Sequence, residues 1–176
     1  MSSLEIRPTT VADLPSITEI YAHAVRVGTA TFELVPPDLA EMTRRFRALT
    51  DGGFPYLVAV MDGDVAGYAY ASSYRPRPAY RFTVENSVYL RPAIHRRGIG
   101  RQLLEQLIAE CETRGFRQMI AVIGDSANAA SVGVHAACGF EMIGTHPSVG
   151  LKFGRWLDTV MMQRELGEGA STVPTA

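Results

Sequence analysis

The chain has 176 residues, 47% of them hydrophobic, and a formal net charge of -1, which suits one domain with a sizeable core. A charge so close to neutral argues against nucleic acid as the main partner, because proteins that follow a phosphate backbone carry a marked basic excess. No stretch reaches the ~18 apolar residues of a membrane span and the N-terminus lacks a secretory signal, so we expect a cytoplasmic protein with no membrane partner.

The first third of the chain predicts a strand and two helices. Residues 4–7 suit a short strand, and Thr10, with Asp13 three residues later, resembles a capping box at the start of the first helix. The second helix is predicted over 38–49 and ends at the glycines that follow it. Two β-rich runs come next, at 56–60 and 65–72, separated by a turn.

That turn contains Asp62-Gly63, which predicts a tight hairpin because such a turn needs residues that tolerate positive φ. A proline-containing loop, SYRPRPAY, then leads into a third β-rich run at about 82–90. The remaining elements are expected in the following order: a helix over 98–114, a strand over 118–123, a helix over 128–137, a strand from 140, a turn within 150–154 and a last strand over 156–164.

This order of elements predicts an α/β fold. Residues 1–166 are expected to form the one domain, and residues 167–176, which lack core-forming side chains, a flexible tail. Cys111 and Cys138 fall in predicted helices beside apolar residues, which fits reduced core thiols better than a disulfide or a catalytic nucleophile. No His, Cys and Asp cluster has the spacing of a metal site, so no metal is expected.

The most informative stretch is VENSVYLRPAIHRRGIGR, at 84–101. A β-rich strand runs into a glycine turn that opens an amphipathic helix, so unpaired backbone N–H groups and the positive end of a helix dipole could meet an anionic diphosphate there. The glycines allow close approach and the arginines add positive charge. These residues are Arg96, Arg97, Gly98, Gly100 and Arg101. The alternatives are a plain strand-to-helix turn and arginines that only face solvent.

Glu85 lies upstream on the same strand and is the candidate general base. An amine is mostly ammonium at neutral pH, so a carboxylate must accept a proton before the amine can attack a thioester. Partial burial in a strand should raise the proton affinity of that carboxylate. The alternative is an exposed strand residue paired with Arg81. An anion cradle with an acid or base upstream suggests a cofactor-dependent group transferase.

Nearly the whole chain resembles the GCN5-related N-acetyltransferase (GNAT) superfamily, and within it the phosphinothricin and methionine sulfoximine N-acetyltransferase branch. The segments that carry the resemblance are GTATFE, TVENSVYL, HRRGIGRQLL, AVIGDSANAASVGVH and GLKFGRWLD. His95 stands where the superfamily's diphosphate loop usually has Gln or Arg. The resemblance implies a GNAT acyl-CoA N-acyltransferase fold, with a central twisted mixed sheet flanked by helices.

The resemblance also implies that acetyl-CoA is the co-substrate and that it lies between the strand ending at Leu90 and the next parallel strand. The residues expected to hold it are Val88, Tyr89 and Leu90 through the main chain, the turn residues Arg96, Arg97, Gly98, Ile99, Gly100 and Arg101, and Asn128 on the cofactor's far arm. The amide N–H near Val88 is a candidate donor to the oxyanion, and the similarity places the family's catalytic glutamate at Glu85.

Arg75 and Arg77 flank Pro76 in an extended segment, so their side chains could fork onto a substrate carboxylate. The alternative is an ordinary surface loop. In similar enzymes of the branch this loop borders the substrate pocket, and Asn86 and Ser87 would then be polar walls beside Glu85.

The expected reaction is direct transfer of acetyl to the α-amino group of a small amino-acid-like acceptor, of the phosphinothricin, methionine sulfoximine or methionine sulfone class. A homodimer is expected from the resemblance alone. The alternatives are acetylation of a protein N-terminus or lysine, and a CoA-binding module without catalysis. His135 is either a packed helix residue or lies near the acetyl group, and Lys152 and Trp156 lie either at the pocket rim or at a subunit interface.

Overall fold

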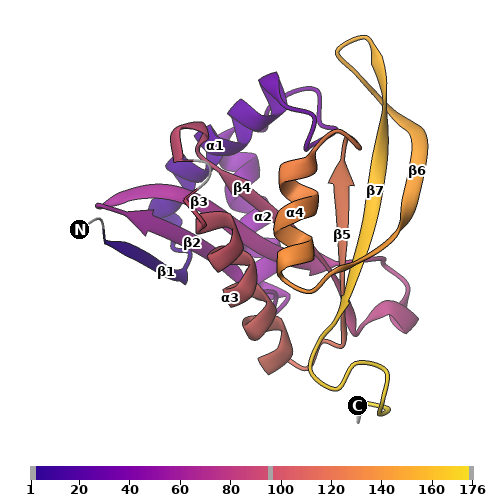
Figure 1. The fold of residues 1–176 in the computed structure, drawn as a ribbon. Helices are drawn as coiled ribbons and strands as arrows, with labels where there is room; N and C mark the ends of the chain where they lie inside the picture. The colour runs from indigo at the N-terminus through magenta and orange to yellow at the C-terminus, as the bar shows by residue number, and fades with distance from the viewer. Residues whose placement is uncertain (1–2, 95–96, 175–176) are drawn as a thin grey trace.

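The computed structural model describes residues 3–94 and 97–174, and all structural statements refer to these. One seven-stranded sheet, in the order β1-β2-β3-β4-β5-β7-β6, is flanked by helices on both faces (Figure 1). All neighbouring strands are antiparallel except β4 and β5, which are parallel. The expected α/β fold with a mixed sheet is therefore confirmed.

The strands are β1 (Leu4–Pro8), β2 (Tyr56–Met61), β3 (Asp64–Ser73), β4 (Thr83–Leu90), β5 (Gln118–Gly124), β6 (Glu141–Lys152) and β7 (Arg155–Glu165). The α-helices are α1 (Leu14–Val27), α2 (Leu39–Asp51), α3 (Ile99–Thr113) and α4 (Ala129–Ala137). Three short 3-10 turns, η1 (Val11–Asp13), η2 (Pro78–Tyr80) and η3 (Pro92–Ile94), precede α1, β4 and α3.

Local sequence signals account for the starts and turns of several elements. The capping box at Thr10 and Asp13 forms on η1, which runs directly into α1. Arg7 also pairs with Asp13, and this hydrogen bond lowers the pKa of Asp13 to about 2. Asp62 and Gly63 both adopt positive φ, 52° and 89°, as a tight two-residue hairpin turn requires.

Two apolar clusters cover the two faces of the sheet. Helix α3 packs on one face through Leu103, Leu104 and Leu107, all fully buried, and α4 lies beside it in Figure 1. Helices α1 and α2 pack on the other face against tyrosines of β2 and β3. The side chain of Cys111 lies in the first cluster as a free, buried thiol, as does that of Cys138, which caps α4 rather than lying inside it.

The feature that creates the site is a break in pairing between the two parallel strands. β4 and β5 pair only from Thr83 opposite Gln118 to Asn86 opposite Ala121. Both strands then continue without pairing, to Leu90 and Gly124. Backbone groups on the facing edges of these ends are therefore free to bind another molecule.

The C-terminal part of the chain forms a hairpin whose turn lies within the expected range 150–154, followed by a tail that contacts the domain. Gly150 lies inside β6, and the turn of the hairpin is at Phe153-Gly154, where φ is 52° and 72°. The described part of the tail, residues 167–174, is held by Arg117, which bonds Glu168 and Thr172. No helix in the described ranges is both long and apolar enough to cross a membrane.

Candidate active site

The main chain of β4 presents two residues to the gap between β4 and β5. Arg91 N–H donates to Ala66 O, so the backbone groups of alternate residues along β4 face β3. The groups of Val88 and Leu90 therefore point the other way, into the gap, as expected for main-chain contacts to a pantetheine arm. Those of Tyr89 point to β3, so the expected main-chain contact from Tyr89 is not supported by this geometry.

A groove of about 340 Å³ runs beside the gap, between the C-terminal half of α1, the end of β4 and α4. Gly100 lies in its wall, so the groove reaches the first turn of α3. Val88, Asn128 and His135 line both this groove and the smaller cavity in the gap itself. A long, narrow ligand with one anionic part could lie along this path.

The glycine turn has the geometry that the sequence predicts for an anion cradle. Gly98 is the N-cap of α3, with φ of 76°, a conformation that side-chain-bearing residues rarely adopt. A Cβ on Gly100 would lie 3.3 Å from Leu90 Cδ1, so this glycine lets α3 start close against β4. The first N–H groups of α3 face no capping side chain in the described chain, which leaves them available to an anion.

The side chains expected around this turn are placed differently from one another. Arg97 is exposed, and Arg101 is exposed with Nε 2.7 Å from Glu105 Oε1. Ile99 is 2% exposed and packs in the core, so it can offer only its backbone. Arg96, like His95, lies outside the described residues.

Asn128 begins α4, and its Oδ1 accepts from Ser131 N at 3.2 Å. This bond orients Asn128 at the wall of the groove, where it was expected to contact the cofactor's far arm.

Glu85 lies half-buried in the middle of β4. It forms no ion pair or side-chain hydrogen bond with another described residue. Arg81, the partner in the alternative reading, instead places its guanidinium 4.6 Å from the centre of the Phe82 ring. Burial raises the pKa of Glu85, which brings the carboxylate closer to the range that suits a general base.

Glu85 and Ser87 lie on the α1 and α2 face of the sheet, beside Ser72 and Tyr70 of β3. Tyr70 belongs to a row of tyrosines whose rings stack 5.0 to 6.3 Å apart. Burial raises the pKa of Tyr70, which keeps its phenol neutral. An acceptor beside Glu85 would therefore meet hydroxyl groups and aromatic rings.

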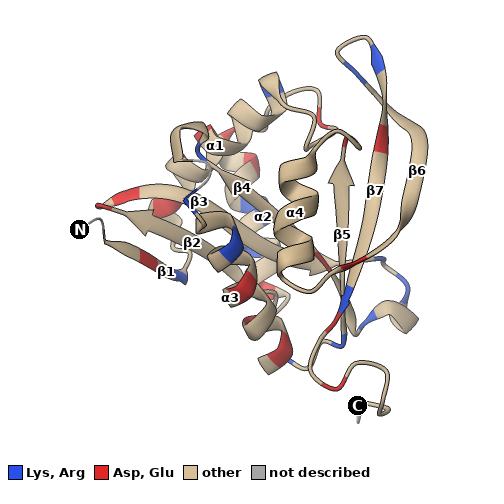
Figure 2. Cartoon of the chain, viewed as in Figure 1, with Lys and Arg blue, Asp and Glu red and all other residues tan. Residues whose placement is uncertain are grey.

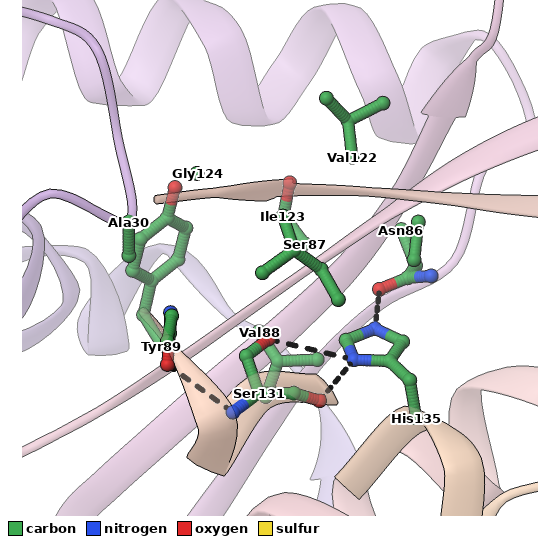
Figure 3. Close-up of a pocket in the computed structure, with 12 residues that line it drawn as sticks. Ala30, Asn86, Ser87, Val88, Tyr89, Val122, Ile123, Gly124, Ser131 and His135 are labelled. Carbon is green, nitrogen blue, oxygen red and sulfur yellow. Dashed lines mark hydrogen bonds between the residues drawn. The ribbon is translucent and has the colours of Figure 1, made fainter. Parts of the chain in front are cut away.

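Asn86 lies on the opposite face, because side chains alternate along a strand. It is 6% exposed, its Nδ2 donates to Ile120 O at 3.3 Å, and its Oδ1 lies 2.9 Å from His135 Nε2 (Figure 3). The expected polar wall of Asn86 and Ser87 beside Glu85 is thus wrong for Asn86, which lines the gap between the strands.

His135 projects from α4 toward this gap, and its Nδ1 lies 2.8 Å from Ser131 O (Figure 3). Burial lowers the pKa of His135, and the hydrogen bond to Ser131 O opposes that effect. His135 is thus a packed helix residue that also lines the gap, and its placement near the acetyl group stays a prediction. Nothing in the spacing of Asn86 and His135 along the chain predicts their contact.

Arg75, Pro76 and Arg77 are all exposed in the loop between β3 and β4. The guanidinium of Arg75 lies 5.1 Å from the centre of the Tyr74 ring, and Arg77 precedes η2. None of the three lines either cavity at the gap. The loop is nevertheless continuous with Ser72 and Glu85, so the carboxylate clamp remains a prediction.

One chain of polar contacts was not predicted from the sequence. Tyr21 OH lies 2.9 Å from Thr31 Oγ1 and donates to Glu33 Oε1, which also accepts from Arg45. The chain links α1, the loop after α1 and α2 beside the aromatic side of the site. No local pattern in the sequence marks these four residues as partners.

The described residues contain no group of three or more His, Cys, Asp or Glu side chains placed to hold a metal ion. Acidic and basic residues are dispersed over the elements, without one large patch of either sign in the view of Figure 2. The site thus offers a half-buried carboxylate, a free strand edge and a glycine-capped helix start, which together suit group transfer from an anionic carrier.

Three comparisons with known proteins agree with this geometry. Residues 17–140 match the model of the Acetyltransferase (GNAT) family. The chain is 60% identical to a phosphinothricin N-acetyltransferase of Alcaligenes faecalis, over 92% of this chain and 82% of that protein. It is 46% identical to an L-methionine sulfoximine/L-methionine sulfone acetyltransferase of Pseudomonas paraeruginosa, over 93% of this chain and 95% of that protein.

Among solved structures, a GNAT superfamily phosphinothricin acetyltransferase of Sinorhizobium meliloti, in complex with AcCoA, superposes with a TM-score of 0.95. It is 52% identical in sequence and the match covers 98% of this chain and 93% of that one. The family match, the relatives and the shared architecture lead to one conclusion: this chain belongs to the GNAT family of acetyltransferases.

Proposed function

We propose that this chain transfers acetyl from acetyl-CoA to the α-amino group of a small amino-acid-like acceptor. The observation that carries the proposal is the placement of Glu85. This carboxylate is half-buried, has no ion-pair partner among the described residues and lies on the strand whose free edge faces the gap. Burial raises its pKa, and the residues around the gap fit a CoA thioester.

Glu85 accepts a proton from the acceptor's ammonium, directly or through water, and so frees the nitrogen lone pair. The nitrogen attacks the acetyl carbonyl carbon, a C–N bond forms, and the C–S bond breaks with its electron pair on sulfur. The second proton lost by the nitrogen balances the one that the thiolate takes up. Val88 N–H, which faces the gap, donates to the oxygen that becomes negative during attack.

The cofactor's diphosphate would lie at the start of α3. Gly98 and Gly100 leave that backbone open, and the helix dipole adds partial positive charge. Arg97 is free of an ion pair among the described residues, whereas Arg101 would have to leave Glu105 or share it. Neither cysteine is needed as a nucleophile, because both are buried in the core.

The acceptor class follows from the relatives' printed names, which are phosphinothricin and methionine sulfoximine or methionine sulfone. All three compounds carry a free α-amino group, an α-carboxylate and a short polar side chain. The neutral tyrosines and serines around Glu85 suit such a compact, polar molecule.

The proposal is tested by measuring release of the CoA thiol with a panel of acceptors. The panel contains phosphinothricin, methionine sulfoximine, methionine sulfone, their carboxamides and short peptides with free N-termini. We expect turnover of the free amino acids and little turnover of carboxamides or peptides. Preference for peptides would support protein acetylation instead, and cofactor binding without turnover of any amine would support a CoA-binding module.

The carboxylate clamp of Arg75 and Arg77 gives a separate prediction. Replacing either arginine by Ala should raise the acceptor KM about tenfold and leave kcat within about twofold, because a bidentate charge pair contributes to acceptor binding before and during the reaction alike. Steady-state kinetics with methionine sulfone checks this. Arg47→Ala, at an exposed position on α2, is the control, and an unaltered KM for both loop variants would contradict the clamp.

We also propose that two copies of the chain associate through β6 and β7. β6 is an edge strand of the sheet, and this hairpin exposes several large apolar side chains, each more than half accessible: Met142, Ile143, Val149, Leu151, Phe153 and Trp156. Along most of β6 the ribbon carries no charged residue (Figure 2). Exposed apolar side chains that gather on one hairpin fit a second identical face.

Replacing Trp156 by Glu should convert the dimer to a monomer at the same protein concentration, because it replaces the most exposed large apolar side chain of this hairpin by a charge. Light scattering after size exclusion measures the mass. Val11→Glu, at a similarly exposed apolar position on η1, should leave the mass unchanged. A monomeric parent protein would contradict the proposed association.

A further inference from the structure

The chain contains 17 basic residues, and Lys152 is its one lysine. The lysine side chain usually keeps its ammonium in water, but Lys152 is only 3% exposed. Burial lowers the pKa of Lys152. A single buried lysine at the end of β6, outside the acetyl-transfer steps described above, requires a reason.

The ammonium of Lys152 contacts the loop that follows α1. Its Nζ donates to the main-chain oxygen of Thr31 at 2.8 Å, a contact that joins residues 121 positions apart. The centre of the Phe153 ring lies 5.0 Å from the same Nζ. Glu33, two residues after Thr31, is the charged group that favours the ammonium form.

Gly150, two residues before Lys152, packs directly against the same loop because it has no side chain. Its place on β6 leaves room for the Phe32 ring, because a Cβ there would lie 2.2 Å from Phe32 Cε2. Leu151, between the two, is exposed, as expected when side chains alternate along a strand. One face of β6 therefore contacts two consecutive loop residues: Gly150 packs against the Phe32 ring, and Lys152 binds the Thr31 carbonyl.

The loop that β6 contacts, residues 29–33, forms part of the site. Ala30 lines both the gap between β4 and β5 and the groove beside it. The Thr31 hydroxyl, which is buried, meets Tyr21 OH at 2.9 Å. Tyr21 in turn donates to Glu33, so a shift of the Thr31 backbone would disturb the polar chain beside the acceptor side of β4.

A second anchor holds the beginning of the loop to β5. Thr29 Oγ1 donates to Asp125 Oδ2 at 2.9 Å, and Asp125 also accepts from Arg155. Gly124 permits this approach, since a Cβ there would lie 2.5 Å from Thr29 O. Thr29 is thus fixed independently, and Lys152 fixes the residues nearer to Tyr21 and Glu33.

We propose that Lys152 is a positioning residue for the acceptor: by holding the Thr31 carbonyl, it fixes the wall of residues 30–33 against which the acceptor is oriented. This inference rests on the proposed acetyl transfer for its kinetic consequence only. The contact between Lys152 and Thr31 exists in the chain whether or not it transfers acetyl. The cofactor's diphosphate site lies at the start of α3, on other elements, so acceptor binding should depend on Lys152 far more than cofactor binding does.

The test compares Lys152→Met, which keeps most of the side-chain volume but cannot donate, with the parent protein. We expect the acceptor KM to rise about tenfold, kcat to change by less than about threefold and the acetyl-CoA dissociation constant to stay within about twofold, since a lost hydrogen bond to a charged group typically costs about that factor or more. Amide hydrogen exchange in residues 29–33 should become about tenfold faster.

Arg164→Met is the matched control. Arg164 is a partly buried cation on β7 that also donates to a main-chain oxygen, that of Cys138. It lies near the end of β7, whereas Lys152 lies at the hairpin turn. The control should lower the melting temperature without changing the acceptor KM or exchange in residues 29–33. An equal KM change in both variants, or unchanged exchange in Lys152→Met, would overturn the positioning role.

A measurement on the parent protein covers the case in which Lys152→Met does not fold. With ¹⁵N-lysine, the chain gives one ammonium resonance and needs no assignment. An ammonium resonance that is protected from exchange and shifts when methionine sulfone is added to the acetyl-CoA complex supports the inference. If that resonance is missing, or does not shift when the acceptor is added, the inference is overturned. If the parent turns over no amine, the proposed function fails, while hydrogen exchange still decides whether Lys152 holds the loop.

Discussion

Replacing Glu85 by Gln is expected to lower kcat by about two to three orders of magnitude, the usual contribution of a general base, while acetyl-CoA affinity stays within about twofold. Gln keeps the shape and length of the side chain, but its amide cannot take the ammonium proton. Stopped assays of thiol release give kcat, and calorimetry with acetyl-CoA gives the affinity. Glu5→Gln, an exposed strand glutamate on β1, is the control and should behave as the parent.

The pH dependence has a defined sign. Burial raises the pKa of Glu85, so the carboxylate becomes protonated at a higher pH than an exposed glutamate does. We expect kcat/KM of the parent to fall as the pH is lowered through that raised pKa, and the profile of Glu85→Gln to lose this limb. Equal turnover by parent and variant across the acid range would remove Glu85 from the mechanism.

The same shift predicts the effect on stability. A raised pKa in the folded state means that the ionised form costs folding free energy, and this cost is present once the pH exceeds the folded pKa. Removing the charge should therefore leave the melting temperature at neutral pH unchanged or slightly higher. A stabilised but inactive Glu85→Gln would separate the loss of chemistry from loss of fold.

Replacing Gly98 by Asp is expected to weaken acetyl-CoA binding by about three orders of magnitude or more, because it combines two effects at the mouth of α3. The φ of 76° disfavours any residue with a side chain, and the new carboxylate would face the diphosphate that the helix start attracts. Among the described residues, a Cβ at Gly98 comes within 4 Å of Gln102 Nε2 alone, at 3.8 Å, so this part of the fold has room for the change.

Gly98→Asn separates charge from backbone strain. Asn has nearly the shape of Asp and tolerates this region of φ better than most residues, but it is neutral. Calorimetry should give a much smaller loss of affinity for Asn than for Asp, and high salt should narrow the difference by screening. Similar affinities for the parent and the Asp variant would place the diphosphate elsewhere.

The sequence allowed most of the architecture to be predicted, since its signals act over a few neighbouring residues. Helix faces repeat at helical spacing, Asp62-Gly63 requires a tight turn, and the capping box acts within four residues. The glycine turn before α3 is equally local, so the sequence predicts both the turn at Gly98 and its suitability for an anion without knowledge of any tertiary contact. The turn at Phe153-Gly154 lies within the predicted range 150–154, and β6 continues through Gly150 to Lys152.

Beside the gap, the sequence points to candidate residues only where they lie on one strand. Glu85 and Val88 belong to a single local pattern, and alternation along β4 then assigns them to opposite sides of the sheet. That rule also places Asn86 and Glu85 on opposite faces of the sheet, whereas their adjacency in sequence had suggested that both line one pocket. The contact between Asn86 and His135 depends on how α4 docks beside the gap, which no local pattern encodes.

What the sequence alone determined is therefore the order of elements, the fold class and the glycine turn that opens α3, because each depends on short-range spacing and backbone preference. The tertiary structure decided that β4 and β5 separate after Asn86, that Glu85 has no partner among the described residues, and that Lys152 reaches Thr31. Those features depend on contacts between residues far apart in the chain, and packing of the whole sheet and its helices fixes them.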